Sequence, residues 1–147
     1  VQHLSIYGFG SFIDARLQSD VINPSTSLVT ANTAGKFVVE TPKWQYGGRV
    51  QVDFDPIAIG LQVKHVGRRY ATDVNDVIAP GYTTVDLDAR IGLKQLGLPQ
   101  TYFQLNVANL FNERYFSNLT TGTDSTSTTR YTFGSPRTFV ASIHFGF

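Results

Sequence analysis

Apolar and polar side chains alternate along much of this chain, most cleanly between Tyr82 and Lys94. One parity of that segment holds only Val85, Leu87, Ala89, Ile91 and Leu93, and the other holds Asp86, Asp88, Arg90, Gly92 and Lys94. A period of two places successive side chains on opposite faces of a strand. No sustained helical series of apolar residues with a cap accompanies it. The pattern therefore predicts an all-β chain whose strands are apolar on one face and polar on the other.

The alternation predicts six strands, at about residues 2–17, 36–54, 57–70, 82–94, 101–112 and 137–147. The first of them is ambiguous in its register. Leu4, Ile6 and Phe12 share one parity, whereas Tyr7, Phe9 and Ile13 share the other. A β-bulge near Gly8 or Gly10 would bring both sets to one face.

Long polar connections follow strands one, three and five, and short turns follow strands two and four. The long ones lie at about residues 18–36, 71–81 and 118–129, and the short ones at Asp55-Pro56 and residues 95–100. In an antiparallel up-and-down sheet, all long loops then fall on one rim and both short turns on the other. Outer-membrane β-barrels have this asymmetry, and strands of about eleven to nineteen residues exceed the roughly 9–11 that cross a bilayer.

Aromatic residues gather near the predicted strand ends, as the interfacial girdles of a membrane barrel require. At the long-loop rim these are Tyr70, Tyr82, Phe111, Tyr115, Phe116, Tyr131 and Phe133, and at the other rim Phe54, Tyr102, Phe103, Phe145 and Phe147. A soluble β-sandwich also alternates apolar and polar residues, but its strands are usually shorter.

Six strands are too few for a bacterial membrane barrel, which has about 8 or more. Open sheet edges in lipid would leave backbone groups unpaired. The chain also begins with an alternating stretch and contains no methionine. We therefore expect residues 1–147 to be a C-terminal fragment of a larger barrel domain, completed by strands from elsewhere.

Composition narrows the function classes. The 12 basic and 11 acidic residues are scattered, which disfavours nucleic acid as a partner because no basic block would neutralise its phosphates. Cysteine is absent, and His3, His65 and His144 lack the spacing of metal ligands. No arrangement typical of a catalytic nucleophile and base is evident, so we expect neither an enzyme nor a cofactor or metal site.

Four segments, in matching order and spacing, resemble the C-terminal end of TonB-dependent outer-membrane receptors. Val66-Gly67-Arg68-Arg69-Tyr70 resembles a strand end of that family, and Pro80-Gly81-Tyr82-Thr83-Thr84-Val85-Asp86 resembles the opening of the next strand. Leu105-Asn106-Val107-Ala108-Asn109-Leu110-Phe111-Asn112 is similar to the family's "LNVxNLFD", with Asn112 where Asp is commoner. Gly134-Ser135-Pro136-Arg137 before the last strand resembles the family's ending.

This resemblance implies a 22-stranded barrel in the bacterial outer membrane, plugged by an N-terminal domain that is not within these residues. It implies active import of a scarce small-molecule nutrient, with a ferric siderophore favoured by family frequency. The implied partners are the N-terminal barrel strands, the plug, outer-membrane lipids and, through the plug, the TonB complex. A passive porin and a soluble carbohydrate-binding β domain remain the alternatives.

Two sets of residues are candidates for function. The polar parity predicts a set that faces the barrel lumen or the plug: Gln51, Asp53, Gln62, Lys64, Asp86, Asp88, Arg90, Gln104, Asn106 and His144. Candidates for ligand contact lie at the long-loop rim: Arg68, Arg69, Tyr70, Asp73, Asp76, Arg114, Tyr115, Arg130 and Tyr131. Arginine binds carboxylates through a bidentate fork and tyrosine stacks on rings. The alternative for these rim residues is contact with lipid headgroups or polysaccharide. We expect the Asn109–Asn112 segment to be structural, because asparagine tolerates left-handed backbone.

Overall fold

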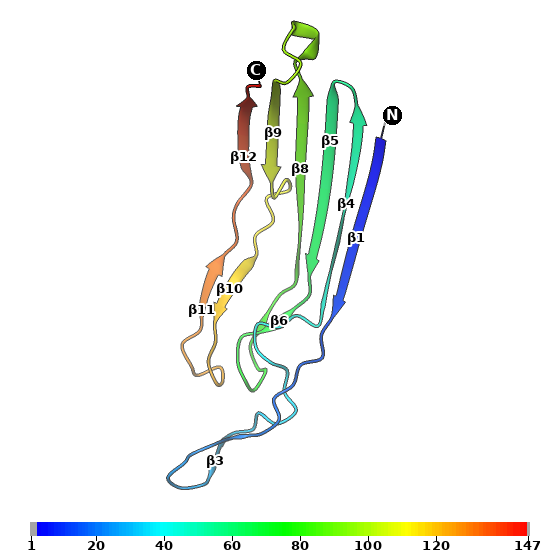
Figure 1. Ribbon diagram of the computed structural model, residues 1–147. Coiled ribbons are helices and arrows are strands. Elements are labelled where there is room, and N and C mark those ends of the chain that lie inside the picture. The colour runs from blue at the N-terminus through cyan, green and yellow to red at the C-terminus, as the bar shows by residue number, and fades with distance from the viewer. Residues whose placement is uncertain (1–2, 147) are drawn as a thin grey trace.

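A computed structural model describes residues 3–146, which form one six-stranded antiparallel sheet and three small hairpins (Figure 1). The sheet runs in the order β1 (His3–Phe12), β4 (Trp44–Phe54), β5 (Ile57–Val66), β8 (Tyr82–Gly92), β9 (Tyr102–Ala108) and β12 (Thr138–His144). The hairpins pair β2 (Val21–Ile22) with β3 (Val29–Ala31), β6 (Arg69–Tyr70) with β7 (Ile78–Ala79), and β10 (Phe116–Thr120) with β11 (Arg130–Phe133). No helix among the described residues is long and apolar enough to cross a bilayer.

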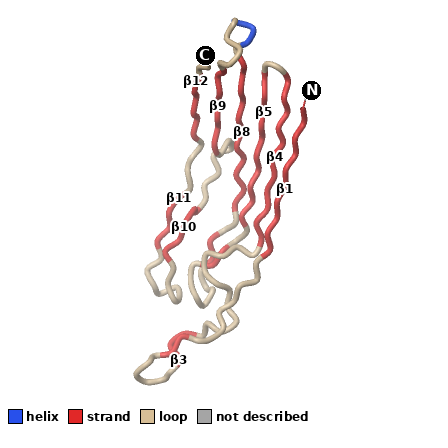
Figure 2. The backbone as a smooth tube through the Cα atoms, in the orientation of Figure 1, coloured by secondary structure: helices blue, strands red, loops and turns tan. Residues whose placement is uncertain are grey.

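The six strands follow one another in the sheet in the same order as along the chain, so the predicted up-and-down arrangement is confirmed. The long connections all lie at one end of the sheet and the short ones at the other, as Figure 2 shows. The β4–β5 connection is only Asp55-Pro56. The β8–β9 connection carries a 3₁₀ turn, η1 (Lys94–Leu96), which ends at Gly97 with φ of 79°. Glycine suits that position because left-handed backbone costs it little.

The sheet has one apolar face and one polar face. Residues directly opposite each other in an antiparallel pair share a face, and one such row crosses all six strands: Ile6, Val50, Leu61, Leu87, Val107 and Phe139. Much of this face is exposed, with Ile6 at 72% and Phe139 at 64%. A soluble sandwich would cover these side chains with a second sheet. Among residues 3–146 no second sheet covers them (Figure 1).

The first strand does not contain the bulge that we expected. Its pairing with β4 is regular from His3 to Phe12. Leu4, Ile6 and Phe12 therefore lie on the apolar face, and Tyr7 and Phe9 lie on the polar face. The Phe9 ring covers the position where Gly47 has no side chain, since a Cβ on Gly47 would lie 2.9 Å from that ring.

Several strands are shorter than predicted. The first ends at Phe12 rather than Leu17, the second begins at Trp44 rather than Lys36, and the fifth ends at Ala108 rather than Asn112. Pro42 has no N–H to donate to a ladder, and Glu40 has a positive φ of 57°, so the segment before Trp44 cannot continue the strand. The third ends at Val66 rather than Tyr70, and Arg69–Tyr70 forms β6 of a short hairpin. The β2–β3 hairpin lies within the predicted loop 18–36, whereas the β10–β11 hairpin extends beyond the predicted loop 118–129 at both ends.

The aromatic bands are only partly as predicted. Phe54, Phe103 and Phe145 lie on the apolar side at the short-turn end, because they share the parity of Ile57, Ile91 and Ile143. Tyr82 and Tyr102 instead lie on the polar face, opposite Val66 and His144. At the loop end the apolar face carries Phe12, Trp44 and Tyr46, which the sequence reading missed. Phe147 lies outside the described residues.

The buried apolar cluster of the described residues is small and lies in the loops. It consists of Ala71, Ala79 and Leu119, with Val77 and Phe116 packed against it. Leu87, Ile91, Leu105 and Phe145 are not part of a closed core, as a soluble domain would require.

Candidate functional site

All ten residues predicted from the polar parity lie on the polar face. Gln51 and Asp88 flank Gly60 in one row, which continues to Asn106. A second row holds Asp53, Arg90 and Gln104. Gln62 and Asp86 lie opposite each other in a third row, and Lys64 and His144 each lie in a row of their own. The strand pairing therefore gathers charges that are far apart in the sequence onto one continuous surface.

The strongest contact on this surface joins Arg49 of β4 to Asp88 of β8. The guanidinium donates to both carboxylate oxygens, with Nη1 at 2.6 Å from Oδ1 and Nη2 at 3.0 Å from Oδ2. The pair crosses the intervening strand β5 directly above Gly60. A Cβ on Gly60 would lie 2.2 Å from Arg49 Nη2 and 2.7 Å from Asp88 Oδ1. The absence of a side chain at position 60 thus makes room for this bidentate pair.

The sequence reading missed Arg49. Its signal was available, because Arg49 shares the parity of Gln51 and Asp53 in a segment with a clean alternation. Arg49 also donates to Gln51, whose amide donates in turn to Asp53. One row of hydrogen bonds therefore runs along β4 from the ion pair toward the short-turn end.

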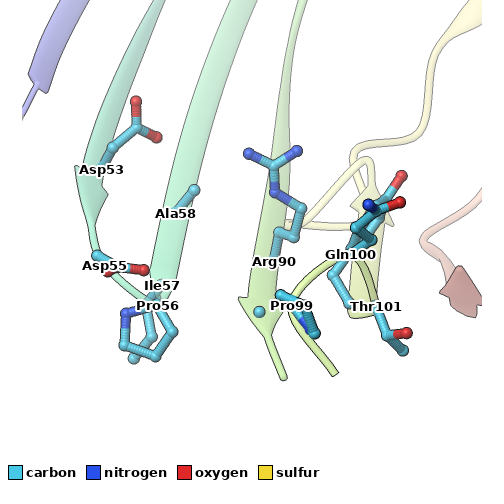
Figure 3. A pocket seen from close by; sticks show the side chains of 11 residues that line it. Asp53, Asp55, Pro56, Ile57, Ala58, Arg90, Pro99, Gln100 and Thr101 are labelled. Carbon is cyan, nitrogen blue, oxygen red and sulfur yellow. The ribbon is translucent and has the colours of Figure 1, made fainter. Parts of the chain in front are cut away.

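A hollow of about 360 Å³ lies at the short-turn end (Figure 3). Asp53, Asp55, Arg90 and Tyr102 are among its lining residues. The Arg90 guanidinium lies 5.3 Å from the centre of the Tyr102 ring, which stacks on His144 at 4.9 Å. This hollow combines both charge signs with aromatic surface, so it is suited to contact with another polypeptide segment.

Asp86 has a structural partner. Its carboxylate accepts a hydrogen bond from the backbone N–H of Asn109 at 2.8 Å. Asn109 is 3% exposed and has a φ of 50°. Its side chain donates to the carbonyls of Glu113 and Ser135 and accepts from the Glu113 N–H. The expected structural role of the Asn109–Asn112 segment is confirmed, since Asn112 also has a positive φ of 55° and accepts from the Arg137 N–H.

Two of the predicted ligand residues instead tie the loops together. Arg69 is 6% exposed and donates to the carbonyls of Phe116 and Ser117 in β10. Asp76 accepts from the Thr72 hydroxyl and from the Ser125 N–H. These two donors favour the ionised carboxylate and hold the pKa of Asp76 below its ordinary value.

The first long connection is bound to the same assembly. Asn75 accepts from the Phe37 N–H at 2.7 Å and donates to the Phe37 carbonyl at 2.9 Å. Glu40 accepts from the N–H of Leu119, whose side chain belongs to the buried cluster. All three long connections are therefore linked by hydrogen bonds.

The other rim candidates divide by exposure. Arg68, Arg114, Arg130 and Tyr131 are exposed, whereas Tyr70 and Tyr115 are half-buried. Tyr70 stacks on Phe37 and Tyr115 stacks on Tyr82 at 4.1 Å. Asp73 is half-buried and its N–H donates to the Gly122 carbonyl. The structure thus separates exposed side chains from those engaged in holding the loops.

The two-faced meander with loops at one rim defines a wall segment of a large β-barrel. It has the fold of siderophore receptor barrels, which confirms at the level of the fold the resemblance seen in the sequence. PiuA, a siderophore receptor from Acinetobacter baumannii, matches 99% of this chain with a TM-score of 0.79 and 20% identity. BauA, the ferric preacinetobactin receptor of the same organism, matches 97% with a TM-score of 0.74 and 20% identity.

The ferric-catecholate import receptor Fiu from Escherichia coli K12, in its closed form, matches 97% of the chain with a TM-score of 0.71 and 20% identity. The chain covers 20%, 20% and 19% of these three receptors, so it spans about a fifth of their length. No protein-family model and no curated protein matches the sequence.

Proposed function

We propose that this chain is the C-terminal part of the barrel of a TonB-dependent receptor, which imports a ferric siderophore or similar nutrient across the bacterial outer membrane. The observation that carries the proposal is a sheet with one exposed apolar face and one polar face. Nearly the whole length of this chain has the fold of the matching part of a siderophore receptor. An apolar face of this kind is stable against hydrocarbon, where the backbone must be satisfied by neighbouring strands. The unpaired edges of β1 and β12 then pair with further strands of the same barrel.

The polar face in this proposal lines the barrel interior and contacts a plug domain. Arg49 and Asp88 neutralise each other, which leaves Asp53, Lys64 and Arg90 as charges for a partner. The hollow lined by Asp53, Arg90 and Tyr102 offers one place for a plug segment. Exposed rim side chains, among them Arg114, Arg130 and Tyr131, are the proposed ligand contacts at the loop end.

Uptake by the full receptor that contains this chain tests the proposal. Cells starved of iron and expressing the receptor should accumulate radiolabelled ferric siderophore, and dissipating the proton-motive force should abolish accumulation. A strain lacking the TonB protein is the matched control and should behave like the de-energised cells.

Accumulation that persists without energy and without TonB would instead support a passive porin, the second function that this wall allows. A receptor that stays monodisperse in water without detergent would contradict both, because an exposed apolar face of this kind requires lipid or detergent.

A further inference from the structure

A group of two cations, Lys43 and Arg68, lies at the loop end of the sheet without ion-pair partners within residues 3–146. Lys43 and Arg68 line a hollow of about 90 Å³ whose other walls include Phe37 and Tyr70. The Lys43 ammonium lies 5.7 Å from the centre of the Phe37 ring, a contact of the cation–π kind.

The acids of these segments contact other groups: Asp14 is paired with a cation, and Glu40 keeps its charge but binds a backbone N–H. Asp14 accepts a hydrogen bond from Arg16 at 3.0 Å, and Glu40 accepts from the Leu119 N–H. Within residues 3–146, neither Lys43 nor Arg68 forms an ion pair. The group therefore carries an excess of positive charge where an anion can approach.

The hollow opens beside the apolar face. The Lys43 ammonium lies 5.4 Å from the centre of the Phe12 ring, and that ring packs on Trp44 at 4.5 Å. Phe12 and Trp44 lie on the apolar face and are each more than half exposed. Aromatic rings at a strand end mark the level of the lipid headgroups, so the cations lie at headgroup height.

We propose that Lys43 and Arg68 bind the phosphate of an anionic lipid in the outer leaflet. This inference rests on the proposed membrane placement of the apolar face. A hollow of about 90 Å³ is well below the roughly 300–1,000 Å³ of sites that enclose a whole small molecule, and a single phosphate group needs far less room. Arginine and lysine are the usual partners of phosphate, arginine through its fork and lysine as a point charge. The acyl chains of the same lipid would then lie along Phe12 and Trp44.

The test measures lipid binding to the delipidated full receptor in neutral detergent by native mass spectrometry. The probe is lipid A with its phosphates, compared with lipid A from which the phosphates have been removed. We expect the wild-type receptor to retain the phosphorylated lipid and the K43A/R68A variant to bind it at least about tenfold more weakly, since two charge-assisted contacts are lost. The dephosphorylated lipid should bind both proteins equally weakly, and inorganic phosphate should compete.

Lys94→Ala is the matched control, because it removes an exposed cation at the opposite, short-turn end of the sheet, and it should bind the lipid normally. The double variant should still resist unfolding on unheated gels. A K43R/R68A variant, which keeps a cation at position 43, should bind the lipid more strongly than K43A/R68A. Equal binding by wild type and double variant would overturn the inference, as would binding that ignores the phosphates. Loss of siderophore uptake with lipid binding intact would assign the cations to the nutrient instead. Absent uptake in the wild-type receptor would overturn the proposed function alone, since lipid binding is read separately.

Discussion

At the scale of single residues, Gly60 controls the main ion pair of the polar face. Gly60→Ala should displace the Arg49 guanidinium from Asp88, because the new methyl group would occupy its place. A double-mutant cycle on Arg49 and Asp88 measures this. The coupling should be at most about 1 kcal/mol in the parent, as for other partly exposed pairs, and should fall toward zero in the alanine background.

Gly10→Ala provides the control for the glycine replacement. Gly10 also lies in a strand, but nothing is within 4 Å of a Cβ added there. That variant should leave the coupling unchanged. An unchanged coupling in Gly60→Ala as well would mean that the pair does not cross β5 as described.

Asn109 should be among the least replaceable residues of the chain. Asn109→Ala removes three side-chain hydrogen bonds at a buried site and forces alanine into left-handed backbone. We expect a loss of about 3 kcal/mol in the free energy of unfolding, measured in urea with the protein in detergent. Asn109→Gly separates the causes, because glycine tolerates the backbone and loses only the hydrogen bonds. Its loss should be smaller by about 1–2 kcal/mol.

The sequence predicted such residues unevenly. Asn109 and Asn112 were predicted to be structural because asparagine tolerates left-handed backbone, and their positive φ angles confirm this. The position of Asp88 and Arg90 on the polar face followed from strand parity alone. Which cation would pair with Asp88 did not follow, because Arg49 lies two strands away in the sheet and reaches Asp88 across β5.

At the scale of elements, the hairpins at the loop end form a unit of their own. The β10–β11 hairpin leaves the main sheet after Asn109 and packs Leu119 against Ala71 and Ala79 (Figure 1). Arg69 and Asp76 fix it to the β6–β7 connection. Beside this apolar packing, the contact includes the Asp76 carboxylate, which makes it sensitive to protonation.

Asp76 gives the contact a pH dependence. Its folded pKa lies below its ordinary value because Thr72 and Ser125 donate to the carboxylate. Such a group contributes stability above its unfolded pKa, and the contribution is lost as the pH falls through the lower folded pKa. The loop contact should therefore persist from pH 5 to 7 and loosen below about pH 4. Limited proteolysis of residues 121–129 measures it.

Asp76→Asn should reproduce the acid-loosened state at neutral pH, with faster cleavage in that segment. Asp73→Asn is the matched control, because Asp73 lies in the same connection and no hydrogen bond to its side chain is found among the described residues. Equal cleavage rates in the two variants would contradict a specific role for Asp76.

Elements were predicted better in their existence than in their ends. All six strands of the sheet were expected, since each alternates over many residues. The first strand ends at Phe12, opposite Trp44 where β4 begins, and the fifth ends at Ala108, before the left-handed Asn109. Alternation alone does not show where pairing or backbone geometry ends a strand. The small hairpins were missed because their strands, such as Val21–Ile22, are too short to show a period.

At the scale of the whole molecule, an added charge should lower stability on the apolar face but not on the polar face. Leu61 lies midway along β5 on the apolar face. Leu61→Arg should lower the unfolding free energy of the membrane-inserted protein by about 2–4 kcal/mol, the cost of arginine on a lipid-facing midplane position. Urea titration of the protein folded into vesicles measures this.

Gln62→Arg is the neighbouring control. It places the same charge one residue further along the chain but on the polar face, and it should change stability little. Equal losses at positions 61 and 62 would show that neither face is in contact with hydrocarbon. The whole-molecule prediction of a barrel wall came from the sequence because loop lengths and strand parity report it directly, whereas the number of strands in the complete barrel depends on residues beyond this sheet.

The hydrogen bonds that join Phe37 to Asn75, Glu40 to Leu119 and Asp76 to Ser125 have a mechanical consequence. A molecule that pushes one of the three long connections aside must break bonds to the other two. The rim would therefore yield as one body, and deleting a single connection would alter the behaviour of those left in place.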